Sequence, residues 1–364
     1  MRLFVKTKDK SYPIYFGSNN CFKIKNILIK NKINAEKLVV IYDKNIPKKI
    51  IVKFKDKLKN SKKIFLGLKF NERLKNLNTV KKILDVLGKN NLNRNDCVIS
   101  IGGGIAGDIC AFAASIYKRG IKFVNIPSTL LSQVDSSIGG KTGVNNFLGK
   151  NMIGTFCQPN VVIVDIIFLR SLSKKEKMCG YAEILKHSLI RDKKFFIFLK
   201  NNFKSIINLS PKIIKKVIIN SCKIKKTIVE KDEKESNLRK SLNYGHTFAH
   251  AFESTLGYSG KLNHGEAVLL GILTASKFSN KENLLPKNEL NLIESHLREL
   301  KYGNLKSYFK KNNITKILDF MIKDKKNINK NINLILLKRI AKPVLNNMYS
   351  HIKVESFLSS LIDK

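Results

Sequence analysis

Three of the six histidines in this chain of 364 residues fall within one short stretch. His246 and His250 are four residues apart, a spacing that places both side chains on one face of an α-helix. His264 follows at the start of the next predicted helix. A catalytic zinc ion commonly takes three protein ligands from His, Asp or Glu and leaves one position for water or substrate. The cluster therefore indicates a divalent-metal site, although a histidine taken singly more often caps a helix or completes a core.

A carboxylate and an amine lie three residues apart in the earlier sequence GYAEILK. Glu183 and Lys186 share one face of a helix predicted over 174–189. Glu183 with two of the clustered histidines would complete a three-ligand metal site, and the spacing alone leaves open which two. The remaining histidines lack such neighbours and receive no role: His187, His296 and His351.

A glycine-rich turn, GGGIAGD, follows one predicted strand and opens a predicted helix. It contains G-x-G-x-x-G, whose small residues let the backbone approach a pyrophosphate at a helix N-terminus. The motif alone is weak, because tight strand-to-helix packing also favours glycine. The acid that usually follows about twenty residues later is absent, since the next strand ends in Ile-Pro-Ser-Thr. Either no dinucleotide binds or an unusual unit binds it, with Asp43 as an alternative ribose partner.

A long polar stretch follows that strand, with the sequence STLLSQVDSSIGGKTGVNNFLGKN from Ser128 to Asn151. Loops of this length inside compact domains are usually functional or disordered, and the mixture of aliphatic residues with isolated charges argues against disorder. Lys141 and Lys150 could hold phosphate or carboxylate oxygens, and Asp135 could take a hydroxyl. We expect a binding role for this stretch.

The elements that must position these residues change in type along the chain. Strand and helix patterns alternate up to about residue 130, and long helical patterns dominate from about 173. The predicted strands cover 38–42, 63–66, 97–101 and 123–126, and the first predicted helices cover 46–59, 76–89 and 107–118. The later predicted helices cover 174–189, 192–206, 211–231, 240–256, 264–280 and 288–300, with an extended segment at 332–337.

This order predicts two domains in one chain. Residues 1–159 would form an α/β NAD-binding domain with a Rossmann-like parallel sheet, and 160–364 a mainly α-helical domain that binds metal and substrate.

The composition restricts the class of protein further. Hydrophobic residues make up 43% of the chain, which is typical of a globular protein, and the six cysteines form no C-x-x-C pair, as expected in a reducing cytoplasm. No apolar run is long enough for a signal peptide or a membrane span. The net charge of +42 raises the alternative of nucleic-acid binding, but the lysines are spread over the whole chain and accompany no DNA- or RNA-binding motif. We expect a protein without nucleic-acid or membrane partners whose positive field attracts anionic substrates.

Taken in order, the motifs resemble those of the 3-dehydroquinate synthase family within the sugar-phosphate cyclases. They are GGGIAGD, RGIKFVNIPSTLLSQVDSSIGGKTGVN, LGKNMIGTF, GYAEILK, LRKSLNYGHTFAH and HGEAV. The resemblance is dense over roughly 100–270 and loose elsewhere. It implies the family's fold, an α/β domain followed by a mainly helical domain.

The resemblance also implies a reaction. Enzymes of this family convert 3-deoxy-D-arabino-heptulosonate 7-phosphate to 3-dehydroquinate and phosphate in the shikimate pathway, which leads to aromatic amino acids. They hold NAD and a divalent metal, usually Zn²⁺, with Co²⁺ as a substitute. A hydroxyl is oxidised, phosphate is eliminated, the ketone is reduced by the same cofactor, and an aldol step closes the ring. The family implies a cytoplasmic homodimer.

Site residues follow from the resemblance by motif position. Glu183, His246 and His264 would be the metal ligands, and His250 would transfer protons, together with Lys186, Glu235 and Asn243 as catalytic residues. The substrate would be bound by Asp135, Lys141, Lys150, Asn151, Lys186, Lys225, Arg239 and Asn243, by Arg119 from a neighbouring subunit, and by Lys325 or Lys326. NAD would contact Asp43, Glu72, Lys75, Gly104, Ile105, Ala106, Gly107, Asp108, Ser128, Thr129, Lys141, Lys150, Phe168, Leu169, Arg170 and Ser171.

Two departures from the family pattern stand out. The usual Asp-Gly-Glu beside the adenosine reads Phe70-Asn71-Glu72, so we expect NAD binding with altered local contacts. The second glycine of GHTFGH is Ala249, which we interpret as a change in packing. The alternatives are another sugar-phosphate cyclase, whose substrate lacks the carboxylate, and a polyol dehydrogenase of similar fold.

Overall fold

The structure is a computed structural model that describes residues 1–8, 10–59, 62–147, 149–257, 261–302, 304–323 and 331–362. The chain forms two compact units, Met1–Gly180 with Ile207–Glu233 and Tyr181–Ile206 with Lys234–Lys364. The boundary predicted near residue 159 is a functional one, between an NAD-binding part and a metal-binding part of the chain. It stays a prediction.

A seven-stranded sheet in the order β1-β2-β9-β6-β5-β3-β4 forms the centre of the first unit. Neighbouring strands are parallel except for the antiparallel pair β1–β2 at one edge. The strands are β1 (Arg2–Lys6), β2 (Ser11–Gly17), β3 (Lys37–Asp43), β4 (Lys62–Leu68), β5 (Cys97–Gly102), β6 (Lys122–Pro127) and β9 (Val161–Asp165). The predicted parallel α/β sheet is therefore confirmed.

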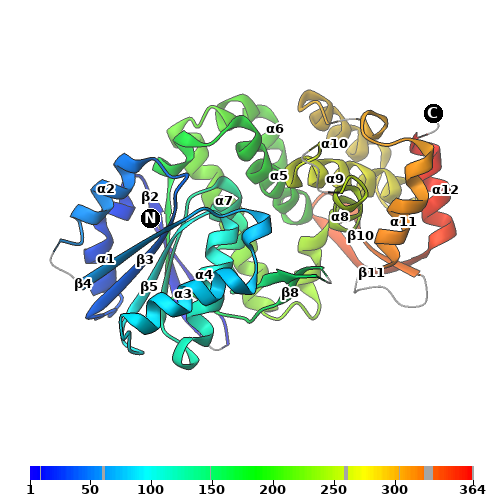
Figure 1. Cartoon of the computed structure of the whole chain (residues 1–364). Helices are drawn as coiled ribbons and strands as arrows, with labels where there is room; N and C mark the ends of the chain where they lie inside the picture. The colour runs from blue at the N-terminus through cyan, green and yellow to red at the C-terminus, as the bar shows by residue number, and fades with distance from the viewer. Residues whose placement is uncertain are drawn as a thin grey trace. The chain divides into compact units, whose positions relative to one another are not determined.

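Helices cover both faces of this sheet, because its strands alternate their apolar side chains between two cores (Figure 1). Leu38 and Val40 of β3 pack with α1 (Ile24–Lys30) and α2 (Lys48–Asp56). Val39 and Ile41 face the other way, toward α3 (Leu77–Lys89) and α4 (Gly104–Ile116). Short helical turns η1 (Asn20–Lys23), η2 (Glu72–Leu74), η3 (Tyr117–Arg119) and η5 (Ile166–Ser171) connect these elements.

The polar stretch after β6 is folded in the first unit and is not an irregular loop. It contains a π-helical turn, η4 (Ser132–Ser136), and a hairpin of β7 (Val144–Asn146) and β8 (Gly149–Ile153). The long helix α7 (Pro211–Lys231) packs on η4, and the thiol of Cys222 donates a hydrogen bond of 3.3 Å to the carbonyl of Gln133. A helix far along the chain thus holds this stretch in place.

The second unit is mainly helical. Its helices are α6 (Lys193–Ile207), η6 (Leu238–Asn243), α8 (His246–Thr255), α9 (His264–Lys281), α10 (Lys287–Glu299), η7 (Leu305–Ser307), η8 (Lys311–Asn313), α11 (Ile314–Ile322) and α12 (His351–Ile362), with most of α5 (Lys174–Arg191). A two-stranded antiparallel hairpin joins β10 (Asn331–Arg339) to β11 (Lys342–Ser350). Among the described residues, no helix combines the length and apolar character that crossing a membrane requires.

The predicted strands and most predicted helices are confirmed within a few residues, and one predicted helix is wrong. The segment 240–256 is not continuous, because η6 ends at Asn243 and α8 begins at His246. Gly245 between them adopts a left-handed conformation with φ of 78°, which breaks the helix. Six strands were not predicted: β1, β2, β7, β8, β9 and β11.

A close backbone contact between α8 and α9 accompanies this break. A Cβ atom on Gly271 would lie 2.2 Å from the carbonyl oxygen of Gly245 and 3.0 Å from the amide nitrogen of Ala249. A Cβ on Gly245 would lie 2.8 Å from the amide nitrogen of Ile272. Two glycines therefore let the start of α8 pack closely against α9 near Gly271.

This contact predicts that Gly271→Ala destabilises the protein by about 1–3 kcal/mol through overpacking, despite the better helix propensity of alanine. Urea and thermal unfolding would measure the change. Gly88→Ala in α3 is the control, since a Cβ there meets nothing within 4 Å and should leave stability unchanged or raise it by up to about 1 kcal/mol. Equal stability of the two variants would show that the helices tolerate separation.

Candidate metal centre and substrate-binding residues

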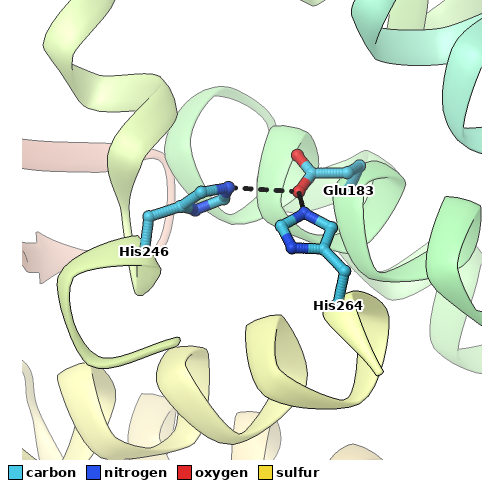
Figure 2. A group of neighbouring side chains, drawn as sticks. All are labelled: Glu183, His246 and His264. Atoms are coloured by element: carbon cyan, nitrogen blue, oxygen red, sulfur yellow. Dashed lines mark ion pairs between the residues drawn. The ribbon is translucent and has the colours of Figure 1, made fainter. Parts of the chain in front are cut away.

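Three side chains of the second unit converge on one point. Glu183 comes from α5, His246 is the first residue of α8, and His264 is the first residue of α9. One ligand atom from each lies within 4.8 Å of the others. The Nε2 atoms of His246 and His264 lie 3.3 and 3.8 Å from the same oxygen, Oε1 of Glu183 (Figure 2). The arrangement presents two imidazole nitrogens and a carboxylate from three separate helices.

The donor atoms at this point fit a divalent cation. Glu183 is only 1% exposed, and neither of its carboxylate oxygens accepts a hydrogen bond within the described chain. Lys186 forms an ion pair with Oε2, which leaves Oε1 directed at the two imidazoles. A buried carboxylate oxygen without a hydrogen bond is costly unless a cation compensates it. Nitrogen and oxygen donors in this number suit zinc or a similar ion.

The local charges set the protonation of these groups. Burial alone would raise the pKa of Glu183, but the charge of Lys186 and contact with His246 hold that pKa well below its usual range. Burial and the charge of Lys186 lower the pKa of His246, which favours the neutral imidazole that metals bind. Burial would also lower the pKa of His264, but the adjacent carboxylates of Glu183 and Glu253 raise it to about 10. A cation at this point would replace the proton of His264.

His250 lies one turn further along α8. Its ring centroid is 5.5 Å from that of His246 and 6.5 Å from that of His264, and its side chain is exposed. The four-residue spacing thus places both imidazoles on one helix face, as expected. The potential metal-binding group formed by Glu183, His246 and His264 contains only the first of them.

Other predicted residues of the second unit lie just before α8. The amide of Asn243 donates a hydrogen bond of 2.7 Å to Oε1 of Glu235, whose backbone is left-handed with φ of 64°. Arg239 in η6 is 2% exposed, so its guanidinium is held within the protein. These three residues form one polar segment that leads into the first histidine.

In the first unit the glycine turn lies at the carboxyl ends of the parallel strands. The Cβ of Asp43 lies 3.6 Å from the position that a Cβ on Gly102 would take. Thr129 and Ser136 cover Gly103 and Gly104, where added Cβ atoms would lie 3.2 and 3.0 Å from them. Open α/β sheets bind ligands at this edge, and the N-terminus of α4 favours an anion there. The backbone of Ser128 joins the same edge through a 2.8 Å hydrogen bond to Gly102.

Two lysines of the first unit are buried and paired with predicted site residues. Lys75, 6% exposed, donates hydrogen bonds of 2.6 Å to Asp108 and to the side-chain oxygen of Asn151. Burial raises the pKa of Asp108 despite this lysine. Lys225 of α7 donates bonds of 2.7 Å to the carboxylate and the carbonyl of Asp135. Buried cations of this kind are suited to oxyanion ligands.

The remaining predicted residues are more dispersed. Lys141, Lys150 and Arg119 have exposed side chains, and Arg119 follows Lys118 in a left-handed turn, with φ of 63° and 48°. In η5, Phe168 and Leu169 are buried, whereas Arg170 and Ser171 are exposed. Lys325 and Lys326 lie outside the described residues.

Sequence reasoning missed Asn145, which connects three parts of the first unit. Its Nδ2 donates a 2.7 Å hydrogen bond to Oε1 of Glu72, and its Oδ1 accepts one of 2.9 Å from the backbone of Asn151. Its backbone N–H donates to the carbonyl of Lys75 at 2.8 Å. An asparagine in a polar stretch gives no sequence signal for such a role. Asn145 ties the β7–β8 hairpin to the segment that carries Glu72 and Lys75.

We predict that Asn145→Ala speeds amide hydrogen exchange in β8 by roughly tenfold or more, because the hairpin loses two side-chain hydrogen bonds of about 0.5–1.5 kcal/mol each. Exchange followed by mass spectrometry would measure this. Asn145→Asp keeps the acceptor for Asn151 but sets a carboxylate against Glu72, so exchange should increase near Glu72 while the Asn151 amide stays protected. Unchanged exchange in both variants would mean that the hairpin is held by other contacts.

The fold resembles that of a solved enzyme. The structure is similar to that of 2-deoxy-scyllo-inosose synthase, crystallised with carbaglucose-6-phosphate, NAD⁺ and Co²⁺, with a TM-score of 0.88, 24% identity and 99% of each chain covered. This similarity shows that the chain has the fold of the sugar-phosphate cyclases.

Sequence comparison identifies the family. Residues 66–179 match the family described as 3-dehydroquinate synthase N-terminal, and residues 180–327 match 3-dehydroquinate synthase C-terminal. The 3-dehydroquinate synthase of Pelagibacter ubique (strain HTCC1062) is 51% identical over 100% of this chain and 99% of the relative. That of Buchnera aphidicola subsp. Cinara cedri (strain Cc) is 43% identical over 99% and 96%. The chain belongs to the 3-dehydroquinate synthase family.

Proposed function

We propose that this protein is an NAD- and metal-dependent 3-dehydroquinate synthase, a carbon–oxygen lyase. It would convert 3-deoxy-D-arabino-heptulosonate 7-phosphate to 3-dehydroquinate and phosphate in the shikimate pathway. The convergence of Glu183, His246 and His264 on one point is the observation that carries the proposal. The 51% identity over the full chain to a 3-dehydroquinate synthase supports it.

In this proposal Glu183, His246 and His264 hold the metal. When bound, NAD would supply a reversible hydride acceptor, and a divalent ion such as Zn²⁺ would supply a Lewis acid for the hydroxyl being oxidised. Lys186, paired with the buried Glu183, keeps that carboxylate ionised and adds a positive charge beside the substrate hydroxyls. His250 lies exposed one turn from His246, where its imidazole can take or give a proton.

The substrate carries a carboxylate and a phosphate, and the proposed binding residues are mainly cations and amides. Arg239 offers a bidentate fork for one of these oxyanions. Asn243 and Glu235, joined by a hydrogen bond, would orient a hydroxyl between donor and acceptor groups. The other proposed contacts are Asp135, Lys141, Lys150, Asn151 and Lys225.

NAD would bind at the carboxyl edge of the sheet. Gly104 and the residues up to Asp108 form the first turn of α4, where backbone N–H groups favour a pyrophosphate. Asp43 beside Gly102 and the pair Glu72–Asn145 would contact the adenosine end. The other proposed NAD contacts are Lys75, Ser128, Thr129, Lys141, Lys150 and Phe168 to Ser171.

We also propose a cytoplasmic homodimer in which Arg119 reaches the phosphate bound by a neighbouring subunit. The exposed side chain of Arg119 supports this, since it is accessible to a second subunit. Light scattering would establish the oligomeric state.

One alternative is that the protein catalyses a different sugar-phosphate cyclase reaction, because its structure is similar to that of 2-deoxy-scyllo-inosose synthase with a TM-score of 0.88. The buried Arg239 and the paired Lys225 favour a substrate with a carboxylate in addition to the phosphate. A polyol dehydrogenase is the other alternative, and it would accumulate NADH.

The first prediction from this proposal concerns turnover. With NAD⁺ and Zn²⁺, the protein should release phosphate from 3-deoxy-D-arabino-heptulosonate 7-phosphate without net NADH accumulation, and a chelator should abolish release. Phosphate detection and absorbance at the NADH band would be followed together. Preference for sedoheptulose 7-phosphate would support the alternative cyclase, and steady NADH formation would support a dehydrogenase.

The second prediction separates the two histidines of α8. His246→Ala removes a proposed ligand and should lower Zn²⁺ affinity strongly. The loss should exceed the factor of about 10–100 that is typical when a residue supporting a ligand is changed. His250→Ala should retain the metal while turnover falls about 10²–10⁴-fold, as expected for loss of a general acid or base. Metal analysis after dialysis, beside phosphate release, tests the division. Equal metal loss in both variants would contradict it.

A further inference from the structure

The two ring nitrogens of each histidine in the metal centre face different partners. For His246, Nε2 lies 3.3 Å from Oε1 of Glu183, and Nδ1 lies 3.3 Å from the carbonyl oxygen of Tyr244. For His264, Nε2 lies 3.8 Å from the same carboxylate oxygen, and Nδ1 lies 3.3 Å from Oε2 of Glu253. Both imidazoles therefore direct Nε2 to the shared point and Nδ1 to an acceptor behind it.

This orientation has a direct chemical consequence. A histidine that binds a metal through one nitrogen usually donates the N–H of the other to a carboxylate or a backbone carbonyl, which fixes the tautomer and the ring orientation. His246 has a backbone acceptor that no substitution removes. His264 has a side-chain acceptor, Glu253, which is 7% exposed and follows His246 by seven residues on the same face of α8.

The two rings also differ in how much of each is enclosed. The side chain of His264 is 36% exposed and that of His246 is 12% exposed. The more exposed ring has fewer packing contacts to prevent rotation about its side-chain bonds, so its orientation depends more on the hydrogen bond at Nδ1.

We propose that Glu253 is a positioning residue of the metal centre. Its carboxylate accepts the Nδ1–H of His264 and holds Nε2 unprotonated toward the metal. One helix, α8, then supplies both a ligand, His246, and the support for a ligand on α9. The inference rests on the proposed metal site, and it assigns Glu253 no contact with metal or substrate.

The test measures Zn²⁺ affinity of metal-free protein by competition with a chromophoric chelator. Wild type and His246→Ala first establish whether the site binds zinc. Glu253→Ala should weaken binding about 10–100-fold, as is typical when an acceptor behind a ligating histidine is removed. Glu253→Gln keeps an acceptor oxygen without the charge and should fall between Glu253→Ala and wild type.

Glu266→Gln is the matched control. Glu266 is also a carboxylate at the start of α9, but it accepts hydrogen bonds from the backbone of Asn263 and from Tyr302. The amide of Gln can still accept from Asn263 through its oxygen and donate through its NH2 group to the Tyr302 hydroxyl. The zinc affinity of Glu266→Gln should stay within about twofold of wild type, well below the about 10–100-fold loss expected for Glu253→Ala. Glu253→Ala should also alter the visible absorption of Co²⁺-loaded protein, which reports ligand geometry, while the control should not.

The outcomes distinguish the possible failures. If wild type binds zinc and His246→Ala does not, but both Glu253 variants bind like the control with an unchanged Co²⁺ spectrum, the role of Glu253 is refuted and the metal site stands. If wild type itself binds no zinc, both the site and the inference are overturned. If Glu253→Ala does not fold, as judged by circular dichroism, a wild-type affinity for Glu253→Gln with an unchanged Co²⁺ spectrum would still refute the inference.

Discussion

The ionised carboxylate of Glu183 is the constraint on which the centre depends. Removing a carboxylate from water costs several kcal/mol unless other charges compensate it, and Lys186 and the two imidazoles are placed to do so. Three helices meet at one point, α5 through the mid-helix residue Glu183 and α8 and α9 through their first residues, His246 and His264. Starting α8 and α9 at these histidines brings the two imidazoles to the carboxylate.

In the first unit, small and polar residues gather along one edge of the parallel sheet. Parallel strands end at the same edge, so Asp43, Gly102 and Ser128 meet there although they are far apart in sequence. In the polar stretch that follows β6, Asn151 accepts a hydrogen bond from Lys75, which also pairs with Asp108 of α4, and Asn145 holds the hairpin in position. Apolar packing fills both faces of the sheet.

Much of this arrangement could be predicted from the sequence, and the exceptions have physical reasons. Buried strands such as β3 and β5 and long helices such as α7 have strong periodicity, so their positions were predicted closely. The break at Gly245 was not, because a left-handed residue between two helical patterns leaves the periodicity nearly intact. The histidine spacing correctly predicted a shared helix face. The roles of Asn145 and Glu253 depend on partners brought near by folding, which spacing does not reveal.

Gly271 is a residue that evolution or engineering of the site would also have to preserve. Gly271 has no side chain and therefore makes no side-chain contact with Glu183, His246 or His264. Its backbone nevertheless sets the separation of α8 and α9, the helices that carry His246 and His264. A search for homologues or designs that required only Glu183, His246 and His264 would accept a chain with alanine at position 271. In that chain the added methyl group would have moved those residues apart. For this centre, the empty volume beside one backbone carbonyl determines the relative placement of His246 and His264 as much as their own side chains do.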